Sequence, residues 1–152
     1  MIDSILKIIY SKYQASDTNG VFLSAYDSSG KLLISQGVLE SEQSIEQTSR
    51  SLYETYIKPL TQADLILIDV VKNLTEQKEY TVVLGMSPSD YGLALKIVQA
   101  ESSVAAILPN TAEIVDMAHA IYAIKQKYQI SGDVILYTFQ TDRFVYTREL
   151  QQ

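Results

Sequence analysis

Apolar residues recur every three or four positions in three parts of the chain, and this spacing predicts three amphipathic helices. The first covers residues 2–13, the second follows a cap at Ser41 and ends before Pro59, and the third is capped by Asn110 or Thr111. Their predicted buried positions are Ile2, Ile5, Leu6, Ile9 and Tyr13; Ile45, Leu52, Tyr53, Tyr56 and Ile57; and Ile114, Met117, Ala118, Ile121, Ile124 and Tyr128.

Shorter apolar runs between these helices predict strands. GVFLSAYDSSGKLLIS reads as a β-hairpin with its turn at 27–30, and LILIDVV at 65–71 is apolar on both faces, as in a central strand. Further strands are predicted at 81–85, 92–98 and 104–108, followed by a last hairpin-like pair, VILYTF and FVYTREL. Short links favour antiparallel pairing, so the expected fold is α+β, a mostly antiparallel sheet flanked by about three helices.

Length and hydropathy narrow the class of protein. The chain has 152 residues, of which 47% are hydrophobic and 20% charged, and a single domain over 1–152 is the expected organisation. No apolar run approaches the roughly 18 residues of a membrane helix. The apolar start is short and carries acidic Asp3 where a signal peptide would be basic. These features predict a cytoplasmic protein with no membrane partner.

The amino-acid composition excludes most kinds of metal and cofactor site. The chain has no cysteine, which excludes thiolate zinc sites and a cysteine nucleophile, and its single histidine, His119, excludes a His-pair metal motif. Glycine-rich phosphate-binding motifs and GxSxG are also absent from the sequence. We therefore expect no cofactor and no metal. The net charge is −6 and the basic residues are scattered, so nucleic acid is not an expected partner.

Two stretches carry the candidate polar chemistry. Asp69 lies inside LILIDVV, where a buried carboxylate could act as a general acid or base. We favour the alternative that it stands at a strand end, an edge or a bulge and faces water or a lysine. The second stretch, KLLISQGVLES, begins as an apolar strand that Ser35, Gln36 and Gly37 interrupt. This interruption is the entrance to a functional loop, a bulge, or the remnant of a lost site.

Read in order, these segments resemble the AMME-syndrome critical-region (AMMECR) domain family, called in bacteria the AmmeMemoRadiSam system protein A family. GVFLSA is similar to the family's Gly-Val-Phe-Val-Thr strand, and LILIDVV, which follows Pro59-Leu60, is similar to its Ile-x-Val-Ser-Val-Leu. The resemblance implies an AMMECR-like α+β fold. It is fullest late in the chain, where the matching residues are Gly92, Leu93, Leu108, Pro109, Lys127, Ile130, Tyr137 and Phe139.

The family's signature, Leu-Arg-Gly-Cys-Ile-Gly, is largely lost from this chain. Alignment places LLISQG, residues 32–37, at the signature, where only the first leucine and the last glycine are kept. A leucine cannot bind a carboxylate or phosphate as arginine does, and a serine in place of the cysteine would need an adjacent base to act as a nucleophile. The departures are Leu33 for the arginine, Ile34 for the inner glycine, Ser35 for the cysteine, and Tyr91 for the histidine before Gly92.

Three functions follow as alternatives. We expect a non-catalytic binding or scaffold domain with a degenerate family site, and the resemblance implies a Memo-like or radical-SAM-like partner. The second alternative is a small homodimeric sensory or regulatory domain, roadblock-like in its strand–turn–strand–helix. The third is an enzyme with a reorganised pocket that uses Ser35, Asp69 and Tyr91. The candidate ligand-binding residues are Ser35, Gln36, Gly37, Asp69 and Tyr91.

Overall fold

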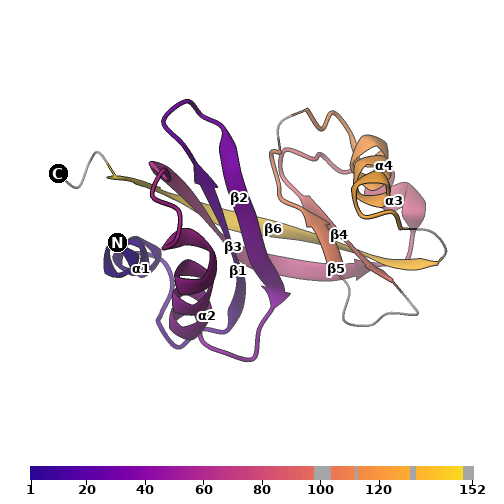
Figure 1. Ribbon diagram of the computed structural model, residues 1–152. Coiled ribbons are helices and arrows are strands. Elements are labelled where there is room, and N and C mark those ends of the chain that lie inside the picture. The colour runs from indigo at the N-terminus through magenta and orange to yellow at the C-terminus, as the bar shows by residue number, and fades with distance from the viewer. Residues whose placement is uncertain (98–103, 112, 131–132, 149–152) are drawn as a thin grey trace. The chain divides into compact units, whose positions relative to one another are not determined.

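The computed structural model describes residues 1–97, 104–111, 113–130 and 133–148. Within these ranges six strands follow one hydrogen-bonded order, β2-β1-β3-β6-β4-β5, and β1 pairs antiparallel with its neighbours, as does β4 (Figure 1). This confirms the predicted α+β class with an antiparallel sheet. The strands are β1 (Asn19–Tyr26), β2 (Leu32–Glu40), β3 (Leu65–Gln77), β4 (Gly92–Ile97), β5 (Val104–Ile107) and β6 (Val134–Thr147). The helices are α1 (Ile2–Ile9), α2 (Ile45–Leu52), the π-helical η1 (Tyr53–Ile57), α3 (Tyr80–Leu84) and α4 (Met117–Lys127).

The chain divides into two compact units. The first comprises Met1–Val71 and Asp142–Gln152, and the second is Lys72–Thr141. Strands β3 and β6 are the longest, and each contributes one part to the first unit and the other part to the second. The single domain over 1–152 stays a prediction.

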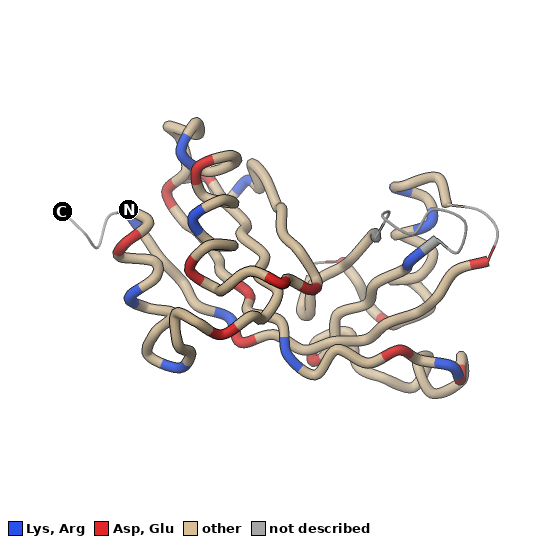
Figure 2. The backbone as a smooth tube through the Cα atoms, turned by 90° about the horizontal axis from the view of Figure 1, so that it is seen from below, with Lys and Arg blue, Asp and Glu red and all other residues tan. Residues whose placement is uncertain are grey.

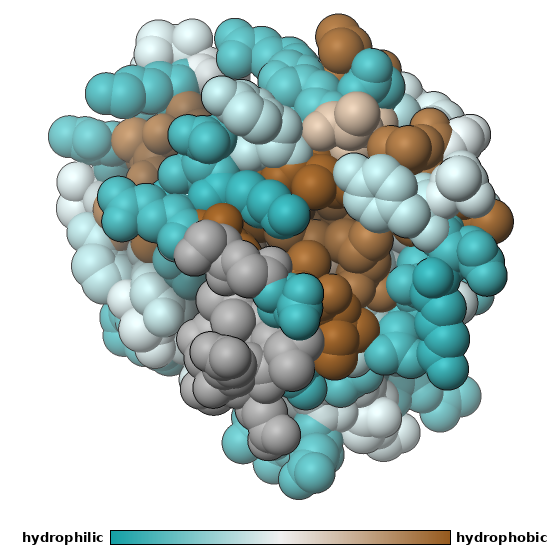
Figure 3. Space-filling view, turned by 90° about the vertical axis from the view of Figure 1, so that its right-hand side faces the viewer, coloured by the Kyte–Doolittle hydropathy of each residue, from teal (hydrophilic) through white to brown (hydrophobic). Residues whose placement is uncertain are grey.

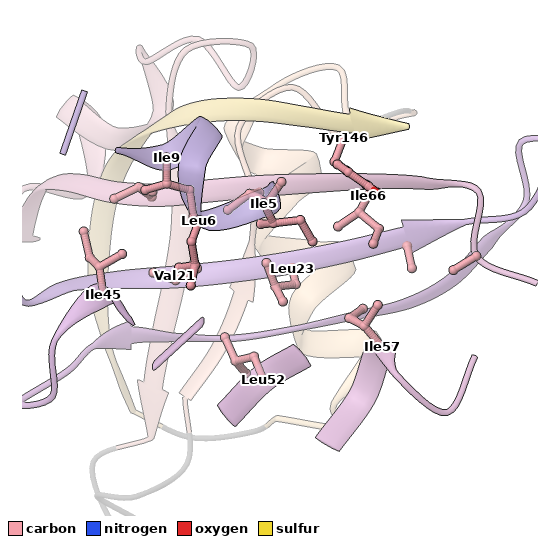
Figure 4. Packing of buried hydrophobic residues seen from close by; sticks show 14 residues of the cluster. Ile5, Leu6, Ile9, Val21, Leu23, Ile45, Leu52, Ile57, Ile66 and Tyr146 are labelled. Atoms are coloured by element: carbon pink, nitrogen blue, oxygen red, sulfur yellow. The ribbon is translucent and has the colours of Figure 1, made fainter. Parts of the chain in front are cut away.

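In the first unit, α1 and α2 pack on one face of the sheet (Figure 4). The apolar stripe of α1 brings Ile5, Leu6 and Ile9 to this core, as its spacing predicts. Alternate residues of β1 fill the core from the other side, so the residues between them point to the opposite face of the sheet. The buried members of this core are Ile5, Leu6, Ile9, Val21, Leu23, Ala25, Ile45, Leu52, Ile57, Ala63, Ile66, Ile68, Val70 and Tyr146.

The second helix begins later than the sequence analysis predicts, because Ser44 rather than Ser41 caps it. The Ser44 hydroxyl oxygen accepts the N–H of Gln47 at 3.2 Å, and the Gln47 side-chain oxygen accepts the N–H of Ser44 at 3.2 Å. This reciprocal capping box satisfies two amides that the helix leaves unbonded. Ser41 instead pairs its hydroxyl with that of Thr48 at 3.0 Å.

In the second unit, α4 packs against β4 and β5, and α3 packs against α4. The predicted caps of α4, Asn110 and Thr111, are wrong. The helix is capped by Asp116, whose carboxylate accepts the N–H of His119 at 2.7 Å. The Thr111 hydroxyl instead donates to the carbonyl of Leu108 at 2.7 Å. The buried core of this unit is Val83, Leu93, Leu95, Ala105, Met117, Ala120, Ile121, Ile124 and Ile130.

Two predicted strand assignments are wrong. Residues 81–85 belong to the short helix α3 and the turn after it, since a run of this length does not distinguish a helix from a strand by its period. The expected last hairpin is one continuous strand, β6. Its centre, QTDR, lacks the glycine or proline that usually turns a hairpin, so the chain continues extended.

Two side chains just after α1 tie this helix to β6. The Asp142 carboxylate accepts a hydrogen bond from Lys12 Nζ at 2.7 Å and another from the Tyr13 hydroxyl. The Tyr13 ring stands edge-on to that of Phe144, with the ring centroids 6.4 Å apart. Burial, followed by the hydrogen bond to Asp142, raises the pKa of Tyr13 well above its usual value. The folded state therefore holds the Tyr13 proton more tightly than the unfolded chain does.

The Tyr13→Phe substitution should lower the free energy of unfolding by about 1 kcal/mol, because the partly buried carboxylate loses a hydrogen bond. A pKa raised on folding makes this contribution fully present below the unfolded tyrosine pKa of about 10 and lost as pH rises above it. Urea unfolding of both proteins from neutral pH to about pH 11 measures the difference. Tyr122→Phe, at an exposed position, is the control. A difference that stays constant with pH would contradict this account.

Candidate functional site

Three of the candidate residues share one face of the sheet in the first unit. Since β1 turns its buried apolar residues toward the helices, the alternate residues Phe22 and Ser24 point to the other side. In the strand ladder, Phe22 stands opposite both Gly37 and Asp69, and Ser24 stands opposite Ser35. Directly opposed residues of an antiparallel pair extend from the same side of the sheet. Ser35, Gly37 and Asp69 therefore lie on the face away from α1 and α2.

Gly37 lies against Phe22 of the neighbouring strand. A Cβ atom at position 37 would collide with the carbonyl oxygen of Val21 and with the Cα and ring of Phe22. Glycine within a strand permits such a close approach, and the aromatic ring covers the backbone that glycine leaves bare. Packing alone therefore accounts for the glycine at this position.

Ser35 pairs its hydroxyl with that of Ser24 at 3.0 Å. Ser24 is buried, whereas Ser35 is exposed on β2. In the part of the chain that the structure describes, the Ser35 hydroxyl has no carboxylate or imidazole partner that could take its proton. A second hydroxyl is not such a base, so the pair can donate or accept hydrogen bonds but does not activate a nucleophile.

Asp69 is fully buried and forms an ion pair with Arg143 of β6. Arg143 Nε donates to Asp69 Oδ1 at 2.9 Å, and the arginine side chain is 30% exposed while that of the aspartate is 0% exposed. The favoured interpretation, an aspartate at an edge or bulge facing water or a lysine, is therefore wrong. Strand β3 has neighbours on both sides, so Asp69 does not stand at a sheet edge, and its carboxylate accepts a charge-assisted hydrogen bond from an arginine of the neighbouring strand β6.

The other two candidates, Gln36 and Tyr91, do not share this face of the first unit's sheet. Gln36 stands opposite Leu23, whose side chain is in the core, so Gln36 extends from the helix-facing side of the sheet, where it is exposed. It does not share the face of Ser35. Tyr91 belongs to the second unit and is half-buried against the core of that unit.

Two polar residues of the same sheet face, Ser24 and Arg143, are not among the site residues predicted from the sequence. A signal for Ser24 was present, because it alternates with the buried Leu23 and Ala25 in a predicted strand. Arg143 carried no comparable signal. Its partnership with Asp69 depends on β6 lying beside β3, which a single sequence does not reveal.

The described residues offer limited chemistry for a site. Among them, no group of three or more aspartate, glutamate or histidine side chains converges as a metal site would require. None of the helices in the described ranges is long and apolar enough to cross a membrane. Acidic and basic positions are interspersed along the backbone of each unit (Figure 2). Among the candidate residues on this sheet face, Ser35 offers an exposed hydroxyl on β2, and the buried ion pair of Asp69 lies on the far side of β1 from it.

The Arg143→Met substitution should lower the free energy of unfolding by about 3 kcal/mol, because it leaves the Asp69 carboxylate buried without its arginine. The double variant Asp69→Leu/Arg143→Met should recover part of that loss, since it removes both charges. Arg50→Met is the matched control. Its ion pair with Asp3 is exposed, so its loss should cost much less than the loss of the buried pair. Equal costs for Arg143→Met and Arg50→Met in urea unfolding would show that the buried pair is not needed.

Comparison with known proteins finds similarity in fold to solved structures. No family model matches the sequence, and no curated protein matches it. Solved structures are similar, among them the crystal structure of an uncharacterized protein from Pyrococcus horikoshii, with a TM-score of 0.69 and 14% sequence identity. The match covers 88% of this chain and 77% of that chain. At this identity the likeness shows a shared fold alone.

Proposed function

We propose that this chain is a non-catalytic protein-binding domain with an AMMECR-like fold and a degenerate family site. The observation that carries the proposal is how the side chains of residues 32–37 are packed and bonded, since the family resemblance locates the polar signature there. Leu33 and Ile34 are half-buried against the core of the first unit, and Ser35 bonds to another hydroxyl. Apolar packing thus occupies positions where the family has arginine and glycine. The exposed side chains that remain, Ser35 and Gln36, can contact a partner without catalysing a reaction.

Exposed apolar side chains in the second unit support a protein partner. Figure 3 shows apolar residues between hydrophilic ones on the face that it draws. Exposed apolar residues of this unit include Val82 and Leu84 of α3 and Val115 before α4. Contiguous apolar surface commonly marks a protein interaction site, and the exposed valine and leucine of α3 are where we propose that such a contact forms. The family resemblance suggests which partners to test, a Memo-type protein and a radical-SAM-type protein.

The enzyme alternative has less support. It requires a base or acid next to Ser35, and the hydroxyl of Ser24 is neither. Asp69 is fully buried in its ion pair with Arg143. Catalytic groups must lie within hydrogen-bond reach of each other and of a substrate.

The proposed function predicts a stable complex between the purified full chain and the Memo-type or radical-SAM-type protein of the same organism. Titration calorimetry and gel filtration of the mixtures measure it. If α3 contributes to the interface, Val82→Asp should weaken binding about tenfold or more, because it puts a charge into a contact that excludes water.

Val145→Asp is the matched control for this experiment. Val82 and Val145 are both valines, both 52% exposed, and they belong to different units. The control should bind as the unchanged protein does. Absence of binding to both candidate proteins would contradict the proposed partners, and turnover of a substrate that is lost in Ser35→Ala would contradict the non-catalytic assignment.

A further inference from the structure

Strand β2 ends the hydrogen-bonded order of the sheet. It pairs with β1 along one side, and no strand of the described chain pairs along its other side. Alternate amide and carbonyl groups of such an edge point away from the neighbour and can bond to another strand.

The edge of β2 lacks the usual features that prevent such pairing. From Leu32 to Leu39 the strand contains no charged residue and no proline. Its one irregularity, an extra residue at Leu33, lies near the hairpin turn and leaves the rest of the ladder regular. Leu32 is 50% exposed and Val38 is 38% exposed. Proteins normally protect a long apolar edge with charges, proline or a covering segment. The edge of β2 lacks the charges and the proline, so it is suited to pairing with another strand.

The sequence of β2 suits antiparallel pairing with a second copy of itself. With a two-fold axis at Gln36, Ile34 of one copy stands opposite Val38 of the other, and Ser35 stands opposite Gly37. Apolar side chains then face each other on the helix side, and small ones face each other on the far side. An axis at Ser35 would instead set Ile34 opposite Gln36, an apolar residue against a polar one.

The charges at the ends of β2 favour the same arrangement. Lys31 precedes the strand and Glu40 ends it, and both are exposed. Antiparallel pairing brings the Lys31 end of one copy beside the Glu40 end of the other, which is attractive. A parallel pairing would bring like charges together at each end.

We propose that β2 pairs edge to edge with β2 of a second copy of this chain, about a two-fold axis at Gln36, and that the protein forms a homodimer in this way. The inference does not rest on the proposed function. It is tested with variants in the first unit, whereas partner binding is tested at α3 in the second.

Sedimentation equilibrium of the full chain over a wide concentration range should show a species of twice the 17.0 kDa chain mass. Val38→Lys should weaken dimerisation about tenfold, since a lysine on an edge strand opposes pairing. Val145→Lys, also at an exposed strand position, should leave dimerisation unchanged. A monomer at every concentration, or equal weakening by both variants, would overturn the proposal.

Disulfide trapping tests the register, because the chain has no cysteine of its own. With the axis at Gln36, two Gln36→Cys side chains stand directly opposite each other, within the Cα separation that a disulfide spans. Gln36→Cys should therefore crosslink rapidly under mild oxidation. Ser35→Cys, displaced from the axis, and Gln43→Cys, exposed beyond the strand, should not. Faster crosslinking of Ser35→Cys than of Gln36→Cys would overturn the assigned axis.

The test also distinguishes another occupant of the edge. If the full chain is monomeric, and Val38→Lys instead abolishes its complex with the Memo-type or radical-SAM-type protein, the edge belongs to that partner and the homodimer is wrong. If Val38→Lys loses both the dimer and the partner complex and its unfolding curve is normal, the result supports the homodimer and shows that the same edge also serves the partner.

Discussion

The register of the β1–β2 hairpin is the constraint on which the first unit depends. Tyr26 pairs with Leu32, but from Ala25 onward the ladder is shifted by one residue, and Ala25 pairs with Ile34. Without the shift every later residue of β2 would face the opposite side of the sheet, because side chains alternate with a period of two. The observed register turns Ile34 toward the core and Ser35 toward Ser24. A single extra residue, Leu33, thus decides which side of the sheet each later residue of β2 faces.

The sequence predicts those elements whose local signals agree with their surroundings. The hairpin turn at 27–30 has its Asp and Gly, with Gly30 at φ 86°, and the doubly apolar run 65–71 is a central strand as expected. Short segments fail where the local pattern is ambiguous. Residues 81–85 fit a strand by composition, but Val83 alone is buried there while Val82 and Leu84 are exposed, and the segment is helical. Tertiary context decides such cases.

The candidate site was harder to predict than the fold, because its members meet across strands. Ser35, Gly37 and Asp69 lie on one sheet face only through the pairing of β2 and β3 with β1. The sequence suggested that Asp69 faced water or a lysine, and the arginine that holds it comes from the far end of the chain. Alternation along β6 separates two roles: Asp142 bonds to residues that follow α1, and Arg143, one position later, reaches Asp69.

Among the described residues, each unit contains a glycine that faces a phenylalanine of the neighbouring strand, and this recurrence bears on how Gly37 is interpreted. Phe22 stands opposite Gly37, and Phe139 stands opposite Gly92; in both pairs a Cβ on the glycine would enter the space of the aromatic ring. A shared packing device explains both glycines without a ligand. Gly37 by itself is therefore no evidence of a ligand-binding site. The polar side chains that β2 leaves exposed are those of Ser35 and Gln36, which lie on opposite faces of the same strand.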